Sequence, residues 1–358
     1  MLVIDGDAHV EEGLETWSYL DPAFHRQRPF TVQFPEDTIF GAHNAAWVID
    51  YKLRLYGGTP TIMKRSSQKG ATIGSQELTD IEERVAAMAE AGVDKQVVFP
   101  TIWQGPVAEN VELEAALASS WNTYMATQCA KSEGRLYYAC VIPYRRPDLA
   151  VAELRRVKQM GCAVGIYTHG MEWDMPLSNP GFWPIYEEAE RLELPLLIHT
   201  GVTSPAITSL LSSYPRPDTQ QFPQTNPYAA GIGTVLYGFT QFMGSSAMED
   251  FPKLRAGILE VGCEWAPRLV KELQARRSGS HVQDWLGDRV FVACAMSDDL
   301  SHVTDRLGDD WLITASDYPH GDAFREDHLT EELHKRGDLS ENTIEKIVSD
   351  NPQRLFPL

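Results

Sequence analysis

The feature that most constrains the fold of this chain is a regular alternation of short apolar segments with amphipathic ones. The apolar segments are rich in Val, Ile and Leu, which is typical of buried strands, and most are followed by a segment of helical periodicity. In residues 80–92, for example, Ile81, Val85 and Met88 share one helix face and Gly92 ends the helix. Eight strands are expected, one beginning at residue 2 and the others at 95–100, 136–142, 162–167, 195–199, 255–260, 289–293 and 311–315.

This alternation predicts an α/β fold of the (β/α)8 TIM-barrel type. Parallel strands need crossover helices, and eight such units close into a barrel whose active site lies at the C-terminal ends of the strands. A doubly wound open sheet would alternate in the same way, but it usually carries a glycine-rich turn after its first strand, where this chain has Asp-Ala-His-Val at residues 7–10. We expect one domain over residues 1–358, with 13–78 and 203–227 as insertions over the C-terminal mouth.

Composition excludes several classes of partner. The 31 basic and 50 acidic side chains give a formal charge of −19, which repels nucleic acid and anionic lipid. No apolar run is long enough to span a membrane, and the N-terminus does not resemble a signal peptide. The five cysteines are scattered without paired spacing, which is typical of reduced thiols in a cytoplasmic protein.

Residues able to bind metal follow four of the expected strands. Asp7 and His9 are two residues apart at the end of the first strand, so their side chains project in the same direction. His199, Glu260 and Asp317 come directly after the strands at 195–199, 255–260 and 311–315. Each residue alone has an ordinary structural explanation, but a barrel places all of them around one axial cavity. The sequence therefore predicts a metal site, with ligand atoms roughly 2.0–2.6 Å from a common centre.

Several longer motifs make the chain resemble the amidohydrolase superfamily. The resemblance is to the amidohydrolase 2 branch, which includes aminocarboxymuconate-semialdehyde decarboxylase. The opening Asp-Gly-Asp-Ala-His is similar to the Asp-x-His-x-His opening of that branch, with Asp7 in place of its first histidine. The other matching segments are residues 179–187, 194–199, 251–255, 316–320 and 351–356.

The resemblance implies that Asp7, His9, His199 and Asp317 are metal ligands. In hydrolytic members the aspartate at the Asp317 position also takes a proton from metal-bound water, whose pKa the metal lowers toward about 7. Glu260 departs from the pattern, because it stands where the decarboxylases have a histidine that activates water.

The remaining candidates have more than one interpretation. Glu260 or Glu12 could bridge a second metal ion, or Glu260 could instead orient His199 without binding metal. His320 could act as a ligand or a proton donor, or cap its loop, so Asp317, His320 and Glu260 are the catalytic candidates. Three residues that follow strands are candidates for substrate binding at the mouth: Trp103, Arg145 and His169.

A carboxylate-rich set of this kind is harder and more anionic than a histidine-rich zinc site. We expect a divalent cation (Zn, Mn or Fe, as one or two ions), with the carboxylates favouring two. The predicted function is cleavage of a C–N, C–O or C–C bond of a small organic acid or amide, by hydrolysis or decarboxylation. The alternative is a dinuclear Fe or Fe/Mn oxygenase on the same scaffold. A homo-oligomer is expected, and a hetero-oligomer with a related subunit is the other possibility.

Overall fold

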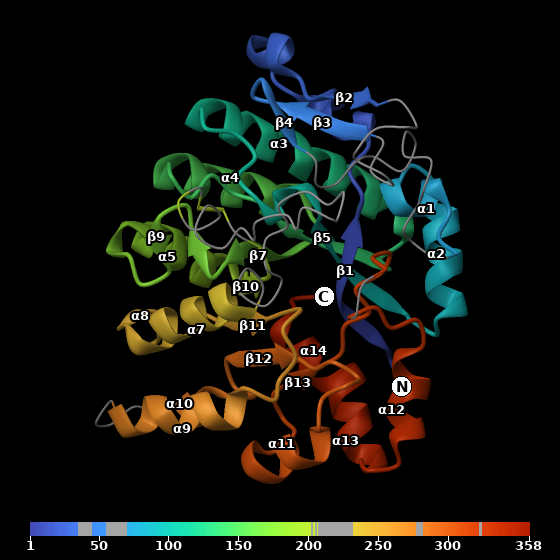
Figure 1. Ribbon diagram of the computed structural model, residues 1–358, viewed down its shortest axis with the longest axis vertical. Helices are drawn as coiled ribbons and strands as arrows, with labels where there is room; N and C mark the ends of the chain where they lie inside the picture. Colours follow the sequence, from blue (N-terminus) through green and yellow to red (C-terminus); the bar gives the residue numbers. More distant parts are fainter. Residues whose placement is uncertain are drawn as a thin grey trace, which may run out of the picture.

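Eight parallel strands form the central sheet (Figure 1). The computed structural model describes residues 1–34, 45–54, 70–201, 203–204, 206, 232–276, 282–321 and 324–358. The sheet follows chain order through β1 (Ile4–Val10), β5 (Lys95–Pro100), β6 (Leu136–Cys140), β7 (Ala163–His169), β10 (Leu196–His199), β11 (Ala256–Ile258), β12 (Val290–Ala293) and β13 (Leu312–Ile313).

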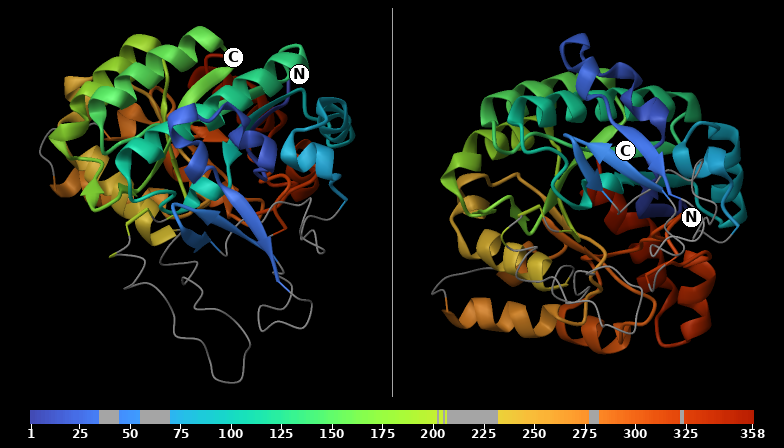
Figure 2. Two further views of the ribbon diagram at one scale, coloured as in Figure 1. Left: turned by 90° about the horizontal axis from the view of Figure 1, so that it is seen from above. Right: turned by 45° about the horizontal axis from the view of Figure 1, so that its top comes forward.

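The sheet closes on itself between its last and first strands. The Gly6 N–H donates to the Thr314 carbonyl at 3.0 Å, and Ala8 forms a parallel bridge with Tyr318. We call this contact between β1 and the segment after β13 the seam. Helices surround the strands (Figures 1 and 2), and the prediction of a TIM barrel is confirmed.

Some of the helices that follow the strands begin at a residue whose side chain caps them. Asp80 accepts from the Glu83 N–H at the start of α2, and Asn110 accepts from the Glu112 and Leu113 N–H groups at the start of α3. The main helices are α2 (Ile81–Glu90), α3 (Val111–Cys129), α4 (Pro147–Met160), α5 (Trp183–Leu192), α7 (Thr234–Gly244), α9 (Ala266–Arg276), α11 (Leu300–Leu307) and α12 (Leu329–Arg336). The shorter helices are α1 (Ile73–Glu77), α8 (Ala247–Asp250), α10 (Val282–Trp285), α13 (Glu341–Glu345) and α14 (Asn351–Leu355).

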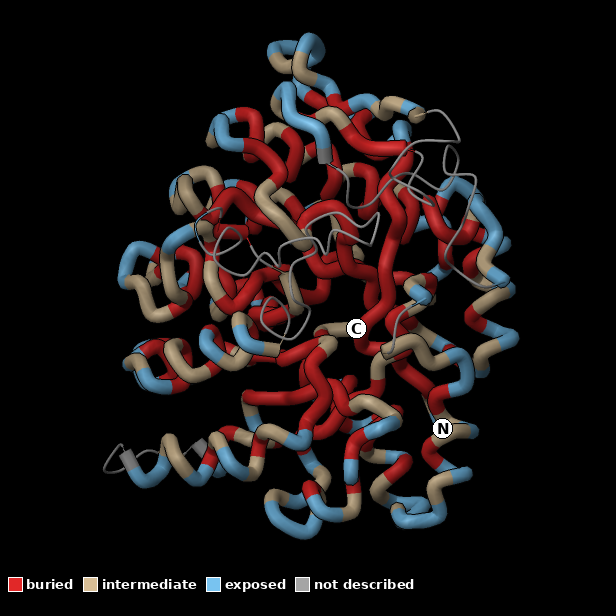
Figure 3. The backbone as a smooth tube through the Cα atoms, viewed as in Figure 1, coloured by how far each residue is buried: buried red, intermediate tan, exposed pale blue. Residues whose placement is uncertain are grey.

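The strands of the central sheet are mostly buried, while many exposed residues lie on the outer sides of the helices (Figure 3). All seven residues of β1 are buried, including its polar Asp5, Asp7 and His9. Burial on both faces is expected for parallel strands covered by helices, but a fully buried charge needs a partner. The polar residues of β1 therefore need a specific explanation. In the described part of the chain, no helix is long and apolar enough to cross a membrane.

Two strands are shorter than their apolar segments predict. β11 ends at Ile258 and β13 at Ile313, and both are followed by a residue in the left-handed region, Glu260 with φ 55° and Asp317 with φ 54°. A side chain in this conformation is uncommon and clusters at functional sites. The backbone therefore leaves the sheet just before the two predicted site carboxylates.

The insertion at 13–78 contains a separate small sheet. Its antiparallel strands are β2 (Phe30–Gln33), β3 (Ala45–Ile49) and β4 (Lys52–Arg54). Asp50 accepts from the backbone N–H groups of Glu109 and Asn110, so the sheet contacts the segment that follows the C-terminal end of β5. Most of the expected insertion at 203–227 lies outside the described residues. A second small sheet not predicted from the sequence pairs β8 (Met171–Glu172) with β9 (Met175–Pro176).

Candidate metal centre

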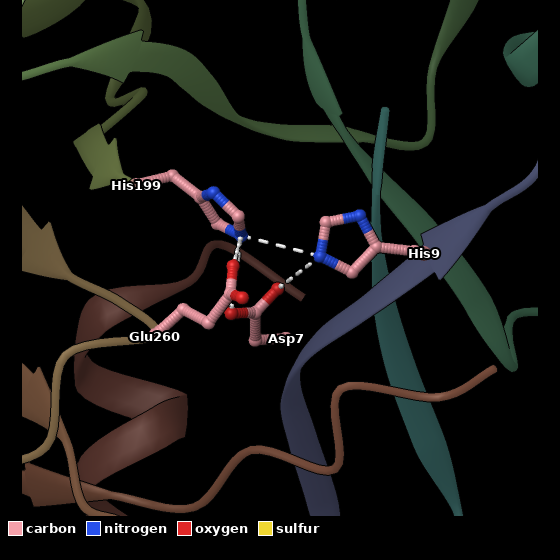
Figure 4. A group of neighbouring side chains, drawn as sticks. All are labelled: Asp7, His9, His199 and Glu260. Atoms are coloured by element: carbon pink, nitrogen blue, oxygen red, sulfur yellow. Dashed lines mark hydrogen bonds and ion pairs between the residues drawn. The ribbon is translucent and has the colours of Figure 1, made fainter. Parts of the chain in front are cut away.

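Four side chains from three strands of the barrel meet in one buried group (Figure 4). Asp7 and His9 come from β1, His199 ends β10 and Glu260 follows β11. One ligand atom from each lies within 4.8 Å of the others. The two histidines and Asp7 are fully buried. Strand-end residues converge here because the C-terminal ends of all strands in a barrel point toward one mouth.

The distances within the group are short and even. The His199 Nε2 atom lies 3.1 Å from Glu260 Oε2, 3.4 Å from Asp7 Oδ2 and 3.2 Å from His9 Nε2. His9 Nε2 lies 3.5 Å from Asp7 Oδ1 and 3.4 Å from Asp317 Oδ1. Donor atoms about 2.1 Å from a single ion, at octahedral or tetrahedral angles, are roughly 3.0–3.4 Å apart. The spacing therefore fits one coordination sphere.

Backbone carbonyls set the orientation of both histidines. The Nδ1 atom of His9 lies 3.2 Å from the Pro100 carbonyl, and Nδ1 of His199 lies 3.0 Å from the Thr200 carbonyl. A carbonyl only accepts, so Nδ1 carries the hydrogen and Nε2 carries the lone pair in the neutral ring. The two Nε2 lone pairs then face each other, an arrangement that a cation between them stabilises.

The electrostatics of the group favour a positive charge at its centre. Burial disfavours a charged His199, but the carboxylates of Asp7 and Glu260 outweigh burial and raise the pKa of His199 to about 10. Burial, with the nearby His320 and His199, holds the pKa of His9 well below its usual value. Burial raises the pKa of Glu260. Neither oxygen of Asp7 accepts a hydrogen bond from any described residue. These buried acceptors fit a divalent cation.

Asp317 and His320 lie beside the group. The His320 Nδ1 atom lies 2.8 Å from Asp317 Oδ1, and its Nε2 atom lies 3.0 Å from the Thr101 hydroxyl oxygen. The His320 ring stacks on His9, with ring centroids 4.1 Å apart. Since a carboxylate only accepts, His320 donates from Nδ1 to Asp317. His9, Asp317 and His320 form a second set of potential ligands that shares His9 with the first.

A residue that sequence reasoning missed, Asp5, holds the two halves of the site together across the seam. Its Oδ1 atom accepts from the Asp7 N–H at 3.3 Å and the Ser316 N–H at 2.9 Å. Its Oδ2 atom accepts from the Ser316 hydroxyl at 2.5 Å and the Gln96 amide at 2.7 Å. Burial outweighs these hydrogen bonds and raises the Asp5 pKa to about 6. An aspartate inside an apolar strand was the available signal.

Glu12, predicted as a possible bridging ligand, is not among the residues of this group. Its Oε1 atom accepts from the Thr101 N–H at 3.1 Å and the Trp121 indole at 3.0 Å, and Oε2 accepts from the Ile102 N–H at 2.9 Å. The carboxylate therefore fastens the segment after β5 to α3. Burial raises the pKa of Glu12 to about 7, although the N–H donors oppose that shift.

Arg145, predicted to bind substrate, has several hydrogen-bond partners within the protein. Its guanidinium donates to Glu114 Oε2 at 3.0 Å and to the carbonyls of Ala108 and Glu109. It also lies over the Trp173 ring, 3.6 Å from the centroid. These contacts make Arg145 a support for the loops around the mouth.

Trp103 and His169, the other two substrate-binding candidates, line one pocket next to the metal group. We call it the side pocket. Its lining also includes Glu114, Tyr144, Tyr167, Glu172 and Trp173. Tyr167 connects the pocket to the metal group, because its ring centroid lies 5.5 Å from that of His199.

Comparisons with known proteins agree with the barrel and with the motifs around the site. The chain is 22% identical over 308 residues to a gamma-resorcylate decarboxylase of Rhodococcus jostii, covering 78% of this chain and 89% of that protein. An amidohydrolase structure from Mycobacterium avium superposes with a TM-score of 0.77 at 18% identity, covering 99% of this chain and 98% of that one. A 5-carboxyvanillate decarboxylase from Novosphingobium aromaticivorans, in complex with manganese and 4-hydroxy-3-methoxy-5-nitrobenzoic acid, superposes with a TM-score of 0.68 at 16% identity, covering 100% and 96%.

The amidohydrolase family model matches residues 4–358, which is nearly the entire sequence. This match extends from the Asp-x-His segment of β1 to the segment after α14. The predictions of a metal-dependent barrel enzyme and of its superfamily are therefore confirmed. The chain belongs to the amidohydrolase family.

Proposed function

We propose that the chain binds a divalent metal ion through Asp7, His9, His199, Asp317 and Glu260, and catalyses decarboxylation of a small aromatic carboxylic acid. The observation that carries the proposal is the buried group in which two histidine Nε2 atoms, 3.2 Å apart, face the Asp7 and Glu260 carboxylates. The gamma-resorcylate and 5-carboxyvanillate decarboxylases support the choice of C–C cleavage over hydrolysis.

The donor set favours manganese or iron over zinc. Three carboxylates and two imidazoles make an oxygen-rich, anionic site, whereas zinc sites are richer in nitrogen and sulfur donors. A bound cation would neutralise the carboxylates and polarise the oxygens of a substrate. The manganese in the carboxyvanillate decarboxylase supports this preference.

The chain's own residues would manage the proton. Decarboxylation releases CO2 and puts a proton on the carbon that held the carboxyl group, so the site has to supply one proton per turnover. The hydrogen bond between His320 Nδ1 and Asp317 Oδ1 is 2.8 Å long and contains a proton next to the His9 ring. We assign the delivery of the proton to this pair, with Thr101 fixing the other ring nitrogen of His320.

The test combines metal analysis with an assay. Purified protein is analysed for metal and then incubated with 2,6-dihydroxybenzoate and with 5-carboxyvanillate, while CO2 and the phenolic product are measured. We expect about one equivalent of metal and CO2 release that a chelator abolishes and Mn²⁺ restores. Metal-independent turnover, or no CO2 release from either acid in the manganese-loaded protein, would contradict the proposal.

The second candidate is a dinuclear iron or iron–manganese oxygenase. The observation that favours it is the number of carboxylates, because three can balance more charge than one divalent ion supplies. Two equivalents of iron or manganese together with substrate-dependent O2 consumption would select this function.

We also propose that the protein works as a homodimer in the cytoplasm, with a hetero-oligomer as the other arrangement. Its five free cysteines suit a reducing compartment.

A further inference from the structure

A chain of hydrogen bonds in the side pocket determines whether the Tyr167 hydroxyl donates or accepts a hydrogen bond. Glu172 Oε1 accepts from the backbone N–H of His169 at 2.8 Å and from the Thr168 hydroxyl at 2.9 Å. The same oxygen lies 3.0 Å from His169 Nδ1. Because a carboxylate only accepts, Nδ1 carries the hydrogen of the neutral imidazole, and Nε2 carries the lone pair.

Tyr167 must then donate to His169. The tyrosine oxygen lies 3.1 Å from His169 Nε2, and the lone pair on that nitrogen can only accept. The hydroxyl hydrogen is thereby used within the protein, while the lone pairs of the tyrosine oxygen remain. No other described residue forms a hydrogen bond with this oxygen. Tyr167 thus offers an acceptor, and not a donor, to a molecule in the side pocket.

The charges around the side pocket also disfavour a ligand group that can only accept hydrogen bonds, such as a carboxylate. Among the described residues that line it, Glu114 and Glu172 are the acidic ones, and none is lysine or arginine. Both glutamates are buried, and Arg145 already pairs with Glu114 at 2.8 Å. A second carboxylate on a ligand would therefore lie near buried negative charge with no free cation to pair with it.

We propose that Tyr167 determines specificity by accepting a hydrogen bond from a hydroxyl or amino group on the part of the substrate remote from the reacting carboxyl group. This inference rests on the proposed function, in which the reacting carboxyl group is held at the candidate metal centre. The two regions are adjacent, because the Tyr167 ring centroid lies 5.5 Å from that of His199. The side pocket thereby selects against acids whose remote group only accepts.

The experiment measures binding of matched acids to manganese-loaded protein by calorimetry. The probes are 3- and 4-hydroxybenzoate, 3- and 4-methoxybenzoate, unsubstituted benzoate and terephthalate. The 2-isomers are omitted because an ortho hydroxyl can itself chelate a metal. At one ring position at least, the hydroxy acid should bind about three- to tenfold more tightly than the methoxy acid, the usual worth of one neutral hydrogen bond. Terephthalate should bind more weakly than benzoate.

Two variants trace the preference to this chain of hydrogen bonds. Tyr167→Phe keeps the ring beside His199 but removes the acceptor, so the preference for the hydroxy acid should disappear. His169→Phe removes the acceptor for the tyrosine hydroxyl, which is then free to donate, so the preference should shift toward the methoxy acid. Tyr19→Phe is the matched control, because Tyr19 is 45% exposed in the first insertion and should leave all affinities unchanged.

The outcomes separate the two proposals. The inference is overturned if the wild type binds hydroxy and methoxy acids equally at both positions, or if the preference survives in Tyr167→Phe. In either case, metal-dependent binding of benzoate leaves the proposed function intact. Absence of metal-dependent binding for every acid overturns both. The wild-type comparison alone decides the matter if a variant fails to fold.

Discussion

Glu260 follows β11 in a left-handed conformation, and its carboxylate reaches His199 at 3.1 Å. Glu260→Gln keeps the shape of this side chain but removes its charge. If Glu260 binds metal, the variant should lose metal and turnover together, because neutral amides are weaker ligands than carboxylates. If Glu260 only orients His199, the loss is typically about 10–100-fold in affinity, and excess metal restores occupancy. We expect the first result, measured as metal equivalents per chain alongside CO2 release.

The matched control for that variant is Glu264→Gln. Glu264 is an exposed carboxylate four residues further on, and it accepts from the Asp299 N–H outside the metal group. It should retain its metal. Full occupancy and near-normal turnover in Glu260→Gln would instead remove Glu260 from the ligand set and disfavour a dinuclear site.

Glu12 provides a prediction about pH. Its pKa is raised from 4.5 to about 7 in the folded protein, with burial as the main cause. The folded state therefore holds this proton more tightly than the unfolded chain does, so stability falls as the pH rises through that window. The free energy of unfolding should decrease between about pH 4.5 and about pH 7 in the wild type, and less steeply in Glu12→Gln. Urea titrations at several pH values measure both slopes.

The control for this comparison is Glu15→Gln, whose exposed side chain should leave the wild-type slope unchanged. Identical slopes in the wild type and in Glu12→Gln would mean that Glu12 does not retain its proton in the fold. The variant should also be less stable overall, by about 1–3 kcal/mol, because an amide cannot accept all of the N–H bonds that Glu12 accepts.

At the residue scale, the sequence predicts which side chains come together, but not which of them form hydrogen bonds with residues outside the site. Asp7, His9, His199 and Glu260 are found together because strand ends of a barrel share one mouth. Glu12 and Arg145 were expected at the same mouth, and each has a side-chain partner from α3. Those partners are distant in the chain, and no local pattern reveals such pairs.

At the scale of elements, α7 packs against the end of β7 through two glycines. A Cβ atom on Gly170 would lie 1.7 Å from the Thr234 carbonyl oxygen, and one on Gly238 would lie 2.2 Å from the Gly170 Cα atom. We expect Gly170→Ala to destabilise the protein by about 1–3 kcal/mol or more, because backbone atoms must separate. Thermal unfolding measures the change.

Gly244→Ala is the matched control, since Gly244 ends α7 and a Cβ there would contact nothing within 4 Å. Its melting temperature should equal that of the wild type or exceed it slightly. A Gly170→Ala variant as stable as Gly244→Ala would show that α7 can move away from β7 at no cost.

The boundaries of elements were less predictable than their existence. Helical periodicity and strand-like runs predict the eight strands and the main helices, because burial imposes those patterns. The early ends of β11 and β13 and the short hairpin β8–β9 depend on left-handed residues such as Trp173, with φ 51°. A conformation of this kind comes from tertiary contacts and leaves no periodic signal in the sequence.

For the whole molecule, we expect a dimer. Six large apolar side chains that are at least 45% exposed belong to the first insertion: Leu14, Tyr19, Phe30, Tyr51, Leu53 and Ile73. Exposed apolar groups gathered in one part of a chain are typical of interaction surfaces, and symmetric dimers are the commonest assemblies. Light scattering should give twice the chain mass of 40.1 kDa at micromolar concentration. Phe30→Asp with Leu53→Asp should shift the mass toward that of one chain, and a monomeric wild type would refute the prediction.

The seam has a consequence for the order in which the protein is made. Asp5 leaves the ribosome well before its partner Ser316, which lies 311 positions later in the chain. Until that segment emerges, β1 has a neighbour on one side only, and its buried Asp5, Asp7 and His9 lack the strand that completes their surroundings. A nascent barrel with an open edge is the kind of intermediate that chaperones protect. Metal binding at this centre therefore has to follow synthesis of the segment after β13, because a chain that stops short of the seam holds only part of the site.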